Sequence, residues 1–172
     1  MSDGLGVWET GDDGSGNAIV KRFWDGKATH CVYLETTETQ TSGALISYLA
    51  AELFVGVKTK GEGLRTSQRA LQPKYSSLGK SEVGYLLRLN PANLSFRNAS
   101  YLGGRNSIGE RTSFEWRELK IFGDRVQVTA ITGEDRGSSP DSLEPGRLCQ
   151  DGSRRILELD YEFSEVIQAT CL

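Results

Sequence analysis

A pattern typical of a β-hairpin, between residues 112 and 132, constrains the fold of this chain more than any other stretch. Residues 112–122 and 125–132 are two strand-like segments, and only Gly123-Asp124 separates them. A two-residue break of this composition between alternating segments is a typical sign of an antiparallel hairpin. An isolated hairpin is only marginally stable, so the rest of the chain is expected to supply further strands.

The apolar phase changes within the first arm of this hairpin. Phe114 and Trp116 share one face of an extended segment, but Leu119 and Ile121 fall in the opposite phase. Because side chains alternate strictly along a regular strand, such a change requires one extra residue. The sequence therefore predicts a β-bulge near residues 117–118.

Further strand-like segments are distributed along the whole chain. They cover residues 6–10, 18–24, 29–36, 83–89, 94–102 and 155–168. The last segment is the clearest, because Leu157, Leu159, Tyr161 and Phe163 alternate with acidic or polar residues. Strict alternation of this kind indicates a strand with one buried face and one face in water.

Residues 44–54 are the only candidate for a helix. Apolar and polar residues fall there at helical spacing, and Ser42 is a plausible N-cap. The residues at this spacing are Leu45, Tyr48, Leu49, Glu52 and Leu53. Ala50-Ala51 also favours a helix, although residues 54–57 continue in the style of a strand. We predict one short helix, with a long buried strand as the alternative.

Roughly eight strands with one short helix fit a closed antiparallel barrel or a two-sheet sandwich. The glycine-containing turns and the expected bulge favour the barrel, because bulges turn the corners of barrels. The prediction is therefore a mainly β protein, an antiparallel β-barrel with one short helix, and a β-sandwich is the alternative. No repeat or boundary divides the chain, so residues 1–172 are expected to form one domain.

Composition limits the partners of the chain. Its 172 residues have a formal net charge of -3, with 20 glycines and 4 prolines. A pI of about 5.3 argues against a nucleic-acid surface, which usually carries a basic excess. No apolar run approaches the roughly 20 residues that span a bilayer, so no membrane span is expected. The first residues lack the basic and apolar regions of a secretion signal, and we expect a cytoplasmic protein.

Metal and nucleophilic chemistry find little support. His30 is the only histidine, which excludes zinc sites with two or more histidines. A catalytic serine triad would have to use His30 as its base. The glycine-rich segment 11–17 fails as a calcium loop, because Arg22 falls where a bidentate glutamate is required. The chain has three cysteines, which are too few for a disulfide framework: Cys31, Cys149 and Cys171. We therefore predict no metal and no cofactor.

Carboxylates on strands offer general acid or base groups. Glu115, Glu118 and Tyr161 are the catalytic candidates if the chain is a metal-independent isomerase, cyclase or lyase. A solvated outer strand face is the simpler explanation of alternating acids. The enzymatic function is thus an open alternative.

Aromatic residues occur on several of the expected strands. In a barrel, inward aromatic side chains either fill the core or line an apolar pocket. The residues predicted to line a ligand pocket are Tyr33, Tyr85, Phe96, Phe114, Trp116 and Phe163. The basic segment 58–80 is a candidate for a loop that gates this pocket.

Gly6-Val7-Trp8 on the first expected strand resembles the Gly-x-Trp opening of lipocalin-like (calycin) barrels. The resemblance implies that Trp8 closes one end of a barrel and that Arg154 or Arg155 packs over it. It also implies a small apolar molecule in the interior. Intracellular members of this wider group include fatty-acid carriers and bilin-handling lyases, so the resemblance fits both binding and catalysis.

Three functions follow from these observations. The first is binding of a small, partly apolar ligand inside a β-barrel. The second is the metal-independent enzyme on the same barrel. The third is a β-sandwich that meets protein partners, or further copies of itself, through a sheet edge or its long loops.

Overall fold

A computed structural model describes residues 7–12, 17–34, 41–49, 51–75, 83–102, 114–132 and 154–171. These residues contain eleven β-strands. The strands are β1 (Val7–Asp12), β2 (Ala18–Trp24), β3 (Lys27–Leu34), β4 (Thr41–Leu49), β5 (Glu52–Thr59), β6 (Val83–Leu89), β7 (Phe96–Leu102), β8 (Phe114–Phe122), β9 (Arg125–Thr132), β10 (Arg154–Asp160) and β11 (Val166–Cys171). The prediction of a mainly β protein is confirmed. Within the described ranges no helix is long and apolar enough to cross a membrane.

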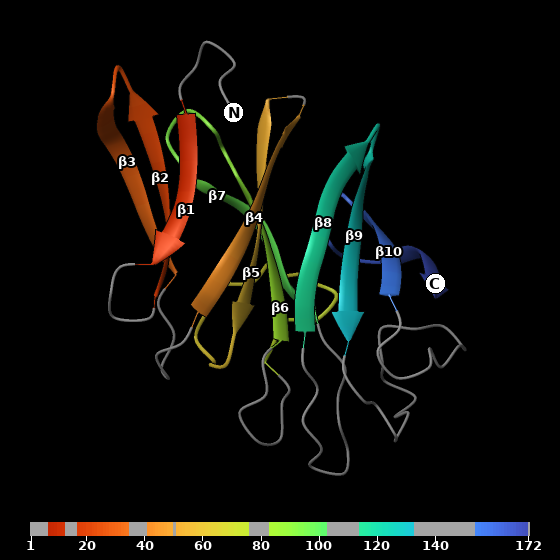
Figure 1. The fold of residues 1–172 in the computed structure, drawn as a ribbon. Coiled ribbons are helices and arrows are strands. Elements are labelled where there is room, and N and C mark those ends of the chain that lie inside the picture. The colour runs from red at the N-terminus through yellow and green to blue at the C-terminus, as the bar shows by residue number, and fades with distance from the viewer. Residues whose placement is uncertain are drawn as a thin grey trace.

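The described strands form three antiparallel sheets (Figure 1). The N-terminal sheet has the order β1-β2-β3, the middle sheet β4-β5-β6-β7 and the C-terminal sheet β11-β10-β9-β8. Every ladder joins two strands that follow each other in the sequence. The ladders of the described strands leave these sheets open, instead of closing them into the one barrel that the sequence predicted.

The predicted helix at residues 44–54 is wrong. Strands β4 and β5 occupy this stretch and pair as a hairpin, with Leu49 opposite Glu52. Ala51 at the turn has a φ of 61°. Leu45 packs on one core, whereas Ile46 and Tyr48 pack on the other, which is the alternation of a strand. Burial on two sides therefore outweighs the helical preference of the alanine pair.

The middle sheet is buried on both of its faces. On β5, Leu53 and Val55 pack against the core shared with the N-terminal sheet, while Phe54 packs against the core shared with the C-terminal sheet. On β6, Leu87 and Leu86 divide between the two cores in the same way. A strand buried on both faces has a continuous apolar sequence, which conceals its period of two.

Trp116 connects the C-terminal sheet to the middle sheet. Its indole N–H donates to the Val57 carbonyl at 2.8 Å, and its ring lies over the Cα of Gly56. A Cβ at position 56 would lie 3.0 Å from the ring. The β8–β9 register shifts between Trp116 and Glu118, so the predicted bulge is confirmed. The bulge puts Trp116 and Leu119 into the same core, although they differ in phase.

Trp8 connects the N-terminal sheet to the middle sheet. Its ring is buried, stacks on Tyr48 with centroids 4.9 Å apart, and donates its N–H to the Pro91 carbonyl at 3.1 Å. The resemblance to lipocalin-like barrels implied a cover by Arg154 or Arg155. Both residues lie in β10, but their side chains fall outside the described part of the chain.

Candidate functional site

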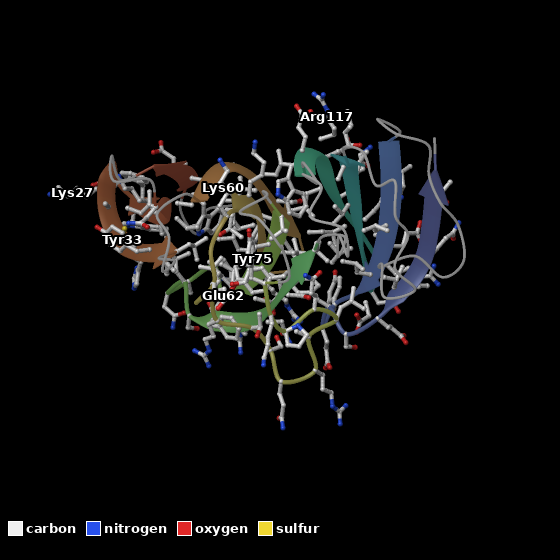
Figure 2. All side chains as sticks on the ribbon, turned by 90° about the horizontal axis from the view of Figure 1, so that it is seen from below. Lys27, Tyr33, Lys60, Glu62, Tyr75 and Arg117 are labelled. Atoms are coloured by element: carbon white, nitrogen blue, oxygen red, sulfur yellow. The ribbon has the colours of Figure 1, made fainter. Side chains whose placement is uncertain are left out.

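The two carboxylates predicted to be catalytic lie on the exposed face of β8. Glu115 accepts a hydrogen bond from Arg117 at 3.0 Å, and Glu118 forms an ion pair with Lys120 at 2.8 Å. All four side chains are about half exposed, and Figure 2 shows Arg117 pointing away from the ribbon. The structure thus places these acids in solvated ion pairs, which is the simpler reading of their pattern.

Tyr161, the third catalytic candidate, lies in the turn between β10 and β11. Its hydroxyl donates to the Gly123 carbonyl at 2.7 Å, and its ring lies 5.2 Å from the Arg88 guanidinium. Burial raises the pKa of Tyr161, and the positive charge of Arg88 partly opposes that rise. Glu115 pairs with Ile131 at the far end of the hairpin, so the structure does not bring it together with Tyr161.

The aromatic residues predicted to line one pocket lie in separate places. Tyr85 is in the core on one side of the middle sheet, and Trp116 and Phe163 are in the core on the other. Tyr33 is 52% exposed, and Phe96 packs under the Arg65 guanidinium at 4.1 Å. The Phe114 side chain falls outside the described residues.

The described part of the basic segment, residues 58–75, is fastened to β7. The Ser67 amide donates to the Ala99 carbonyl at 2.9 Å, and the Tyr101 amide donates to the Gln72 carbonyl at 3.1 Å. The Tyr101 hydroxyl accepts from the Leu64 amide at 3.1 Å. Burial raises the pKa of Tyr101 to about 12. These bonds cover the outer edge of β7, so this part of the segment is a packed cover and does not fit the predicted gate.

His30 and Cys31 point to different faces of β3. His30 Nδ1 lies 3.3 Å from the Thr29 hydroxyl, and the Cys31 thiol is exposed. Among the residues that the structure describes, no group of three or more His, Cys, Asp or Glu is arranged to hold a metal ion. Cys149 falls outside the described residues.

The outer edges of the three sheets differ in how they are covered. Strand β4 lies beside both β1 and β8, and β7 is covered by residues 61–75. Strand β3 has an extra residue near Thr29, where its register with β2 shifts. Tyr33 and Leu34, at the other end of β3, have interaction partners of their own. The outer edge of β11 is different, because within the described ranges no strand or loop pairs with it.

Strand β11 has the composition of a sheet-pairing segment. It reads Val-Ile-Gln-Ala-Thr-Cys, with no charged residue, proline or glycine. Ile167 is 40% exposed, and Gln168 and Thr170 are also exposed. Proteins usually protect an edge strand with lysine, proline or a cover, because its free N–H and C=O groups can pair with another chain. Among the residues that the structure describes, the protection of β11 is a register shift that leaves Ile167 without a partner on β10.

A rigid turn holds β11 in place. Asp160 accepts hydrogen bonds from the Ser164 amide and hydroxyl, both at 2.7 Å, and from the Glu165 amide at 3.1 Å. Phe163 is fully buried, and its carbonyl accepts from the Leu71 amide at 2.7 Å. Strand β11 therefore starts from a fixed position. It lies at the outer flank of the C-terminal sheet in Figure 2, and its colour is the last one on the scale of Figure 1.

The sequence pattern did not reveal this edge. Residues 155–168 were expected to form one strand, whereas β10 ends at Asp160 and β11 begins at Val166. The sequence does contain a sign of the break between β10 and β11. Apolar residues fall at odd-numbered positions as far as Phe163, whereas the next one, Val166, falls at an even-numbered position. Asp160 and Ser164 are also residues that favour turns, through side-chain hydrogen bonds to the backbone.

Comparisons of the chain with protein-family models, with curated proteins and with solved structures give no match.

Proposed function

We propose that this chain is a protein-interaction module that binds its partner by accepting an additional strand at the outer edge of β11. The observation that supports this proposal is the uncharged outer edge of β11, which no described strand or loop covers and which a hydrogen-bonded turn holds in place. In strand addition, main-chain hydrogen bonds supply affinity, and alternate side chains supply specificity. Exposed Ile167 offers the apolar contact, and Gln168 and Thr170 offer polar contacts on the outer face.

The positions of the predicted site residues weigh against the two alternatives. Glu115 and Glu118 are engaged in solvated ion pairs, and the Tyr161 hydroxyl donates a hydrogen bond to the β8–β9 turn. An acid or base needs contact with a substrate in a pocket that excludes water. Of the aromatic residues that were expected to surround a ligand, Tyr85 lies on one side of the middle sheet, and Trp116 and Phe163 lie on the other.

A ligand-holding barrel is the second candidate. It is favoured by the order of the described strands, since each of their ladders joins sequence neighbours in antiparallel orientation, as in up-and-down barrels. A small molecule of definite mass that co-purifies with the protein in native mass spectrometry would favour this candidate over strand addition.

A photoreactive side chain at the open edge tests the proposal. We expect a photoreactive phenylalanine analogue at Gln168 to form a covalent adduct with another protein chain in the cells that make this protein. The same analogue at Lys120, exposed on the outer face of β8, is the matched control and should give no adduct. Adding Thr170→Lys to the Gln168 variant should abolish the adduct, because it puts a charge on the pairing strand. Equal adducts at both positions, or none at Gln168, would contradict strand addition.

A further inference from the structure

The lack of charge on β11 restricts the identity of the added strand. When two identical strands pair in antiparallel orientation about a two-fold axis, each side chain lies opposite, or diagonal to, a copy of itself or its near neighbours. A charged residue near the axis would then face its own like charge. Strand β11 has no charged residue, whereas β3 carries Lys27. Self-pairing therefore costs no charge repulsion at β11.

The carboxylate of β10 that lies opposite the middle of β11 already has a cationic partner. Glu158 lies opposite Gln168 in the β10–β11 ladder. It accepts from Arg125 at 3.2 Å and from Gln127 at 3.4 Å. A partner selected by charge would find no free cation or anion on the pairing strand itself. This neutrality favours a second copy over an acidic or basic partner segment.

The side chains of β11 also complement their own copies. In an antiparallel pair with its axis beside residue 169, Gln168 lies opposite Thr170 of the partner subunit. Both residues are exposed on the outer face, and an amide and a hydroxyl can donate to and accept from each other. The exposed Ile167 adds apolar area near each end of the pair.

We infer that two copies of this chain associate through antiparallel pairing of their β11 strands. This inference rests on the proposed strand addition and names its partner. The two C-terminal sheets, four strands each, then form one continuous sheet across the two-fold axis. Pairing is isologous and closed, so it gives a dimer and no longer assembly. Because two six-residue strands make a small interface, we expect weak association, in the micromolar range or above.

Charge exchange on β11 tests the inference. In sedimentation equilibrium the unaltered protein should approach twice its 18.9 kDa mass as its concentration rises. The variant Gln168→Lys/Thr170→Lys and the variant Gln168→Glu/Thr170→Glu should each dimerise roughly 10- to 100-fold more weakly, since like charges face each other. An equimolar mixture of the two variants should restore the dimer. Circular dichroism should show both variants folded, because both positions are exposed.

The control adds the same charges to the other outermost strand. Thr29→Lys/Cys31→Lys on β3 should leave dimerisation unchanged. A dimer that survives both β11 variants, or a mixture that stays monomeric, would overturn the β11 pairing. A protein that is monomeric at every concentration would overturn self-association but not strand addition. A photo-adduct between Gln168 and a different protein would then still support strand addition. The absence of both the dimer and the adduct would overturn both proposals.

Discussion

Replacing Gly56 by valine is expected to destabilise the protein by about 2–4 kcal/mol, because the new side chain collides with the Trp116 ring. A Cβ alone would lie 3.0–3.1 Å from three atoms of that ring. The indole is held by its hydrogen bond to the Val57 carbonyl, so it cannot move away without losing that bond. Urea unfolding monitored by circular dichroism measures the change in the free energy of unfolding.

Two control variants separate this collision from other effects. Gly56→Ala adds only the Cβ and should destabilise less than Gly56→Val. In a Trp116→Leu background, the additional loss caused by Gly56→Val should shrink, because the ring that it meets is absent. A Gly56→Val protein as stable as the unaltered chain would contradict the close contact between the middle and C-terminal sheets.

Replacing Arg88 by alanine is expected to destabilise the protein by about 2–3 kcal/mol, because it leaves the Glu52 carboxylate partly buried and unpaired. The two side chains form an ion pair at 2.9 Å and are only 19% and 18% exposed. Arg88 also donates to the Tyr161 carbonyl at 3.4 Å and lies over the Tyr161 ring. It thus links β5, β6 and the turn that precedes β11.

The matched variant removes both charges. Arg88→Met with Glu52→Leu should recover most of the lost stability, since no uncompensated charge is then buried. Glu52 Oε2 and Arg88 Nε have no hydrogen-bond partner among the described residues, which makes an apolar pair an adequate replacement. If the single and double variants lose the same stability, the ion pair is not the cause. Thermal unfolding of the three proteins side by side makes this comparison.

Local patterns predicted the hairpin around Gly123-Asp124 and strands β6 and β7, but not the β4–β5 hairpin of the middle sheet. The Gly123-Asp124 hairpin has one exposed face, so its alternation is visible, and its phase change located the bulge. Strand β5 packs on both faces, and its continuous apolar residues carry no alternation to detect. The same continuity, together with Ala50-Ala51, gave the false helix. Burial on two faces depends on which sheets meet, and no local pattern encodes that.

The candidate site was missed for a related reason. Whether β11 is an open edge depends on which strands and loops lie beside it, as the cover of β7 by residues 61–75 illustrates. The predicted catalytic and lining residues were selected by chemical type. The structure distributes most of those that it describes over surface ion pairs and two separate cores, so type alone did not bring them together.

Amide hydrogen exchange of β11 at different protein concentrations tests the central claim most directly. In dilute protein, the amides of β11 that do not bond to β10, roughly half of them by the alternation of an antiparallel ladder, should exchange rapidly. They should become protected as the concentration rises, while those of β9, a central strand, stay protected throughout. Equal protection of β11 and β9 in dilute protein would show that the chain covers its own edge, and would contradict the proposed binding function.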